Sequence, residues 1–262
     1  MLDKKILNKN DLKVSFIFMI LAGLGGLLIG LYQLPLLSPN QLQGMSNAIF
    51  ISMFTIQSAI LYGLILGFLG LKLSRATNLN KGLLQTIFTE KKYKFNLGSA
   101  KLAILFGFIN AAVITLSEKF VFAKLIPEIA NSTSTFSPLY LLSGIVYGGI
   151  VEEIMLRLFF MSLVTFILYK IFARKKDKQD IPPSFYWISI IISGLVFALG
   201  HLPAAYLSFN VTSIVLFRII FMNAFAGILF GYIYWKKGLE YSIISHMFSH
   251  IFMQLLFLPI LF

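Results

Sequence analysis

Residues 138–172 read PLYLLSGIVYGGIVEEIMLRLFFMSLVTFILYKIF, an apolar run that carries two carboxylates and an arginine near its middle. A membrane-spanning helix needs about 20 apolar residues. At about 1.5 Å per residue, this stretch would form a straight α-helix of about 52 Å, which is too long for a single upright crossing. We therefore expect it to tilt strongly, to break near Glu152-Glu153, or to form two helices.

Apolar runs of the same kind recur along nearly the whole chain. Of the 262 residues, 58% are hydrophobic and 12% are charged; soluble domains have about 45–50% and about 25%. The sequence predicts an all-α, polytopic transmembrane helical bundle with about seven crossings or eight helical segments and a polar intramembrane cavity. Residues 1–137 supply N-terminal helices and a basic loop, and residues 138–262 supply the core helices of the same domain. The expected crossings are 14–37, 47–73, 101–117, 138–172, 184–203, 210–235 and 239–260.

The net charge of +12 arises mainly in the connecting segments and not on an apolar face. Lysines and arginines gather before the first crossing, in 72–101, in 173–183 and at Lys236-Lys237, whereas 38–46 carries no charge. By the positive-inside rule, this alternation predicts a cytoplasmic N-terminus. We expect a multi-pass protein of the cell membrane, bacterial by its Lys-, Ile-, Asn- and Phe-rich composition, whose partner is the lipid bilayer and not nucleic acid. The absence of cysteine excludes disulfides, a cysteine nucleophile and Cys-ligated zinc.

The charged residues of the 138–172 run are the first candidate site. An ionisable group inside a membrane span costs about 2.5–3.5 kcal/mol by insertion scales, so its presence suggests a function. Glu153 and Arg157 are i,i+4 neighbours on a helix and can form an ion pair. Glu152 is turned about 100° away and is free to face a different group. The alternative is that the three charges only hold helices together.

All three histidines of the chain lie in or beside later apolar segments. His201 is followed closely by Pro203, which predicts that the helix ends or kinks there. His246 and His250 share one helix face, a spacing that suits a metal ion, or one ring donating to an oxyanion while the other orients a neighbour. Simple helix contacts are the alternative. On straight helices His201 and His246 lie at different depths, so a break, a tilt or a water-filled cavity is needed for them to meet.

Three motifs in this order resemble those of a known family. EEIMLR at 152–157 matches EExxxR, FALGH at 197–201 matches FxxxH, and the segment from His246 matches HxxxN. These are the motifs of the CAAX-protease and bacteriocin-processing family, also called the Abi or CPBP intramembrane protease family. The resemblance covers roughly 138–255, and it departs from the family pattern at the last position, where His250 replaces the usual Asn.

The resemblance implies a role for each motif residue. Glu152 would be the general base that activates water for attack on a peptide carbonyl, and His201 would share or orient that water. His246 and the residue at position 250 would stabilise the oxyanion, with Glu153 and Arg157 as the orienting pair. A zinc version is also open, with Glu152, His201, His246 and also His250 as possible ligands, so the cofactor is either none or zinc.

The expected function is that of an intramembrane endopeptidase that hydrolyses a peptide or membrane-protein precursor. In a bacterium this activity would serve peptide maturation or bacteriocin self-immunity, whereas prenylated CAAX substrates belong to eukaryotic members of the family. Two other classes remain open. One is a proton-coupled transporter or channel in which the buried carboxylates and histidines relay protons. The other is a non-catalytic membrane scaffold that gives immunity only by binding partners.

Overall fold

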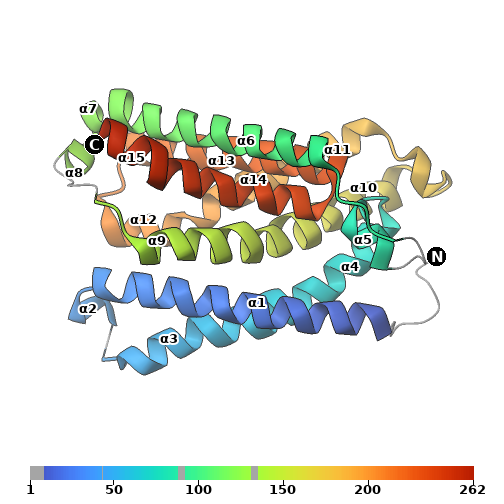
Figure 1. Ribbon diagram of the computed structural model, residues 1–262, viewed down its shortest axis with the longest axis horizontal. Helices are drawn as coiled ribbons and strands as arrows, with labels where there is room; N and C mark the ends of the chain where they lie inside the picture. The colour runs from blue at the N-terminus through green and yellow to red at the C-terminus, as the bar shows by residue number, and fades with distance from the viewer. Residues whose placement is uncertain (1–8, 43, 88–91, 131–134) are drawn as a thin grey trace.

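The computed structural model describes residues 9–42, 44–87, 92–130 and 135–262, and within these ranges the chain is helical and contains no strand (Figure 1). Seven helical spans in this part of the chain are long and apolar enough to cross a membrane. The predicted all-α polytopic bundle with seven crossings is therefore confirmed. The spans are Lys9–Leu36, Asn47–Ala76, Leu97–Leu125, Pro138–Phe172, Pro183–Leu207, Ser213–Lys237 and Leu239–Leu261.

The first two spans pack closely against each other. Span 1 consists of α1 (Lys9–Gln33) and a 3-10 turn (Leu34–Leu36), and α2 (Pro39–Leu42) follows it. Span 2 consists of α3 (Asn47–Ile56), a π-helical stretch (Gln57–Leu66) and α4 (Gly67–Ala76). A Cβ on Gly63 would lie 2.6 Å from the carbonyl oxygen of Phe18, so only glycine permits this approach. At one end, the Arg75 guanidinium donates two hydrogen bonds of 2.7 Å to the buried Asp11 carboxylate.

Span 3 is longer than the predicted 101–117. It comprises α6 (Leu97–Ser117), a π-helical turn (Glu118–Phe122) and α7 (Ala123–Leu125); α5 (Leu83–Ile87) precedes it and α8 (Pro127–Ala130) follows it. The helix continues through Glu118 because Arg218 of span 6 holds that carboxylate with hydrogen bonds of 2.7 and 2.6 Å. A prediction from apolar residues alone would place the end of the helix at Glu118.

Span 4 is one continuous helix through the Glu152-Glu153 pair. It runs through α9 (Pro138–Ser143), two π-helical stretches (Gly144–Glu152 and Ile154–Met161) and α10 (Ser162–Phe172). The expectations of a break at the pair or of two separate helices are therefore wrong. The helix remains continuous here but has wide i→i+5 turns, which are frequent at functional sites.

The last three spans form antiparallel neighbours. They are α11 (Pro183–Gly200) with the short α12 (Leu202–Ser208), then α13 (Ser213–Lys237), then α14 (Leu239–Phe252) with a π-helical turn (Met253–Phe257) and α15 (Leu258–Leu261). A short 3-10 turn (Lys178–Asp180) precedes α11. Gly238 has φ +116°, which allows the tight reversal from α13 into α14.

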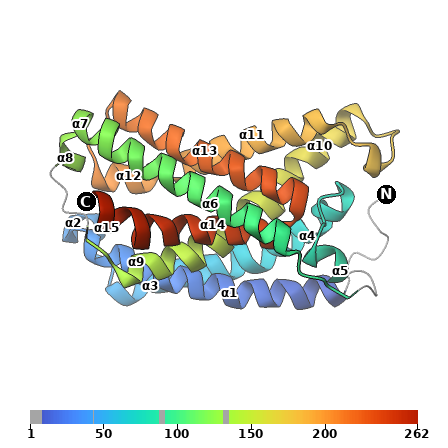
Figure 2. The same cartoon turned by 45° about the horizontal axis from the view of Figure 1, so that its top comes forward.

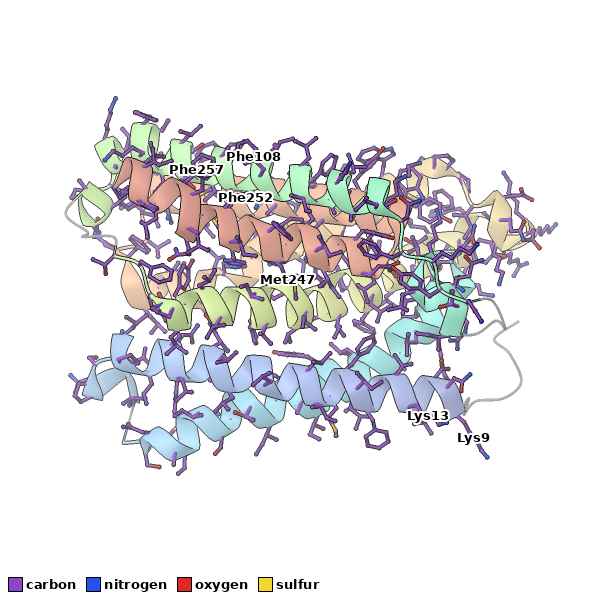
Figure 3. The ribbon with its side chains drawn as sticks, viewed as in Figure 1. Lys9, Lys13, Phe108, Met247, Phe252 and Phe257 are labelled. Atoms are coloured by element: carbon purple, nitrogen blue, oxygen red, sulfur yellow. The ribbon has the colours of Figure 1, made fainter. Side chains whose placement is uncertain are left out.

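Span 4 lies in the middle of the bundle. Figure 1 and Figure 2 show α1, α3 and α4 on one side of it and α6, α13 and α14 on the other, and both α1 and α14 contact its π-helical half. Met247 of α14 points toward span 4 (Figure 3), where a Cβ on Gly149 would lie 2.5 Å from its Cγ. On its other side, α14 packs on α6 through Phe108, whose ring lies 5.4 Å from that of Phe252 and 5.6 Å from that of Phe257 (Figure 3).

Candidate active site

Glu153 and Arg157 form the predicted ion pair at the centre of span 4. Both side chains are fully buried, and the Glu153 Oε1 atom lies 3.1 Å from an Arg157 terminal nitrogen. The Arg157 nitrogens have no directed hydrogen-bond partner among the described residues. Because a buried charge is costly without compensation, other groups must also stabilise this guanidinium.

Two aromatic rings supply that stabilisation. The Arg157 guanidinium lies 4.8 Å from the ring centre of Phe197 and 5.4 Å from that of Phe230. A planar guanidinium stacks well on aromatic faces, and the attraction grows when water is excluded. Arg157 is thereby held by rings from α11 and α13, so span 4 is fixed to both of its neighbours at this level.

The Glu153 carboxylate also orients His246 of α14. The Ser242 hydroxyl donates to one carboxylate oxygen at 2.5 Å and lies 2.9 Å from the carbonyl oxygen of Phe230. The His246 Nδ1 atom lies 2.9 Å from the other carboxylate oxygen. An ionised carboxylate only accepts hydrogen bonds, so Nδ1 carries the proton and donates it. The imidazole is therefore fixed with its Nε2 edge turned away from Glu153.

That Nε2 edge faces Glu152. The distance from Nε2 to the Glu152 Oε2 atom is 3.8 Å, and the Glu152 side chain keeps 16% of its surface exposed. Glu152 thus faces His246 and not Arg157, and the two carboxylates lie beside opposite nitrogens of the same imidazole. The separation is too long for a direct hydrogen bond and suits a bridging water molecule.

His250 lies flat against a bare surface of span 4. A Cβ on Gly144 would lie 2.5 Å from the His250 Nδ1 atom, and a Cβ on Gly148 would lie 2.9 Å from Nε2. The His250 ring stacks on that of His246 at 5.2 Å, and Phe230 stacks on the other face of His246 at 4.4 Å. Within the described parts of the chain, the buried His250 Nδ1 atom has no hydrogen-bond partner.

His201 stands at the predicted helix break, between the end of α11 at Gly200 and the start of α12 at Leu202. Its Nδ1 atom lies 2.8 Å from the Phe197 carbonyl oxygen, so Nδ1 carries the proton and Nε2 is left as an acceptor when the ring is neutral. The Phe197 ring packs edge-on against His201 at 4.7 Å and against His246 at 6.0 Å. One aromatic ring therefore links the two histidines, although no hydrogen bond or ion pair between them occurs in the described residues.

The zinc ligand set suggested by the sequence is not assembled. Among the residues that the structure describes, no three His, Asp or Glu side chains converge closely enough to hold a metal ion. Glu152 and His246 approach each other, but His201 makes its contact through the Phe197 ring. The described residues therefore do not fit zinc in this arrangement.

Several contact residues of this site were missed by the sequence reasoning. Ser242, His246 and His250 are spaced by four residues along α14, and Gly144, Gly148 and Glu152 are spaced by four along span 4. These two stripes face each other in the structure. The shared spacing could have indicated both Ser242 and the two glycines. Phe230 carries no comparable signal, because it is one of 27 phenylalanines.

Comparison with known proteins supports the motif assignment. The family model described as type II CAAX prenyl endopeptidase, Rce1-like, matches residues 133–252, which include all six candidate site residues. No curated protein and no solved structure matches the chain. The matched region, residues 133–252, is therefore similar to the Rce1-like CAAX endopeptidases, in agreement with the intramembrane protease family that the three motifs resemble.

Proposed function

We propose that the protein is an intramembrane endopeptidase in which Glu152 activates the attacking water. The observation that carries this proposal is the 3.8 Å separation between Glu152 and His246, whose ring is locked by Glu153. A water molecule between the two is held by a carboxylate on one side and an imidazole on the other. The match of residues 133–252 to the CAAX endopeptidase family model supports peptide hydrolysis as the reaction.

The chemistry follows from the charges on these groups. Glu152 removes a proton from the water while the water oxygen bonds to the peptide carbonyl carbon. The negative charge then moves to the carbonyl oxygen. His250 stabilises that oxyanion by donating from a ring edge, and His246 does so from Nε2 in its imidazolium form, in which both ring nitrogens carry protons. Glu152 then gives the proton to the leaving amine, the C–N bond breaks, and the carboxylate is regenerated.

The other residues act by positioning. Glu153 fixes the orientation of His246, and Arg157 compensates the charge of Glu153. His201 has an unoccupied Nε2 edge and orients the water or the substrate from the end of α11. Positioning of this kind matters because small displacements of reacting groups cost large factors in rate.

The substrate is a peptide or protein that reaches the site from the membrane. A secreted peptide precursor fits the bacterial composition, and its processing would serve maturation or self-immunity against a bacteriocin. We place the N-terminus in the cytoplasm, because Lys9, at the start of α1, lies at the same end of the bundle as the basic segments after span 2 and after span 4 (Figures 1 and 3). The cell membrane is the corresponding location.

The test uses membranes that contain either the wild type or the Glu152→Gln variant. The measurement is which proteins are released or shortened in each. Loss of a general base lowers the rate by about 10²–10⁴-fold. Glu128→Gln is a matched control, because Glu128 is an exposed carboxylate on α8. Wild-type cleavage by a folded Glu152→Gln variant would refute the proposal. A His201-dependent proton flux in proteoliposomes without cleavage would indicate transport instead.

A further inference from the structure

A polar cavity lies at the end of the bundle where α1 begins, away from the candidate active site. It has a volume of about 550 Å³ and is bounded by the loop after α4, the segment before α6 and the reversal between α13 and α14. Four of its lining residues are Lys81, Lys94, Lys236 and Lys237, and none of the described lining residues is a carboxylate. The lining therefore carries a concentrated positive charge.

Three of the four lysines act on one another through their charges. The Lys81 ammonium donates a hydrogen bond of 2.8 Å to the Trp235 carbonyl oxygen in the last turn of α13. Burial, followed by the charges of Lys236 and Lys237, lowers the pKa of Lys81 below its usual range. On the adjoining turn, Glu240 accepts a hydrogen bond from the backbone N–H of Leu83 at 2.8 Å and is not part of the lining. The Tyr93 hydroxyl, a lining group, lies 3.4 Å from Glu240 Oε1, so this one carboxylate borders the cavity and offsets part of the charge of its four lysines. The balance stays positive, and an anion within the cavity would relieve the remaining repulsion.

A helix N-terminus adds to the positive potential. The 21-residue helix α6 begins at this cavity, and Asn96 and Ser99 of its first turn are lining residues. The Asn96 side chain accepts from the Ser99 backbone N–H at 2.8 Å, and the Asn96 N–H donates to the Tyr241 hydroxyl at 2.7 Å. The N-terminal end of a long helix favours anions, above all phosphate.

An aromatic cluster places the cavity at the level of the membrane interface. The Trp235 ring stacks on Tyr186 at 5.0 Å and packs edge-on against Trp187 at 5.9 Å. The Lys236 ammonium lies 3.5 Å from the centre of the Trp235 ring. Trp and Tyr gather at the depth of lipid head groups, and basic residues at the cytoplasmic side attract anionic lipids.

We infer that this cavity binds a phosphate group, carried by an anionic phospholipid head group or by a soluble phosphate compound. The four ammonium groups supply the charge, and the polar side chains beside them, among them Asn78, Asn80 and Tyr241, supply neutral hydrogen-bonding groups. Four lysines line one cavity, and ammonium groups form charge-assisted hydrogen bonds with phosphate. The inference does not depend on the proposed peptidase activity.

The experiment measures binding to the purified full-length chain in detergent. The probes are phosphatidylglycerol, phosphatidylcholine and inorganic phosphate, and the readouts are lipid retained by native mass spectrometry and the shift of the unfolding temperature. The test variant is Lys236→Gln/Lys237→Gln. Its matched control is Lys175→Gln/Lys176→Gln, an adjacent exposed pair in the basic segment after span 4 that does not line the cavity.

We expect phosphatidylglycerol to bind the wild type and the control pair equally, and phosphatidylcholine to bind far less. Each lysine removed from the cavity should weaken binding roughly fivefold. If Lys236→Gln/Lys237→Gln does not fold, Lys94→Gln in the exposed segment before α6 tests the same cavity. Saturable binding of inorganic phosphate alone, lost in the cavity variants, would identify a soluble source. Equal binding of every probe to all variants would overturn the inference.

Discussion

The Nε2 atom of His246 and the Oε2 atom of Glu152 face each other across 3.8 Å, while Glu153 holds the opposite nitrogen of the same ring. One imidazole therefore separates two adjacent carboxylates that have different surroundings. Glu153 is fully buried and has three partners, Ser242, His246 and Arg157. The Glu152 side chain remains partly exposed, as a general base that deprotonates water must.

Glu153→Gln should destabilise the protein far more than Glu152→Gln. Removing one partner of a buried ion pair leaves an uncompensated charge and costs about 3–5 kcal/mol. The free energy of unfolding in detergent, measured by denaturant titration, checks this difference. The double variant Glu153→Gln/Arg157→Met removes both charges and should recover much of the loss. Equal stability of the two single variants would contradict the assignment of Glu153 as the structural carboxylate.

Gly148→Ala should reduce cleavage at least tenfold by displacing two imidazoles. The added Cβ would lie 2.9 Å from the His250 Nε2 atom and 3.2 Å from the His246 Nε2 atom. A displacement of this kind in a catalytic site costs large factors in rate. Gly98→Ala is the matched control, because its Cβ would meet only the Asn96 side chain, at 3.3 Å. Unchanged kcat for Gly148→Ala would show that the position of these rings does not matter.

His250→Asn should retain cleavage within about tenfold, whereas His250→Leu should lose about 10²-fold or more. An amide keeps a hydrogen-bond donor for the oxyanion, and loss of one such donor costs about 10²–10³ in kcat. Asn is also smaller than His and fits beside Gly144 and Gly148. The test compares kcat for the two variants, and circular dichroism checks that both are folded. Equal activity of both variants would exclude position 250 from oxyanion stabilisation.

Exhaustive chelation should leave cleavage unchanged. In the part of the chain that the structure describes, no three ligand side chains converge on one point. The measurement is the initial rate of cleavage before and after dialysis against a zinc chelator, with a known zinc protease treated in parallel. A loss of activity that returns on addition of zinc would show that substrate or metal brings His201 together with Glu152 and His246.

The seven spans could be predicted from the sequence because span length and apolar content are enough to define them. The Glu153–Arg157 contact was also predictable, since a helix brings i,i+4 side chains together. The limits of span 3 were not, because Glu118 is neutralised by Arg218, which is distant in sequence. Local patterns do not reveal such partners.

The convergence of Glu152 and Glu153 on one imidazole was not predictable either. A regular α-helix turns adjacent residues about 100° apart, and the sequence does not show that wide π-helical turns surround this pair. The place of Phe230 between Arg157 and His246 depends on how α13 packs against α14. Both features belong to tertiary packing and not to the motifs.

The contacts around Arg157 and Glu153 have a consequence for biosynthesis. Span 4 can enter the lipid with its two charges already paired, because they are neighbours on the same helix. The rings of Phe197 and Phe230 arrive with spans 5 and 6, and Ser242 and His246 arrive only with span 7. A nascent chain halted before α14 would carry a carboxylate without two of its three partners, a state that membrane quality control could recognise.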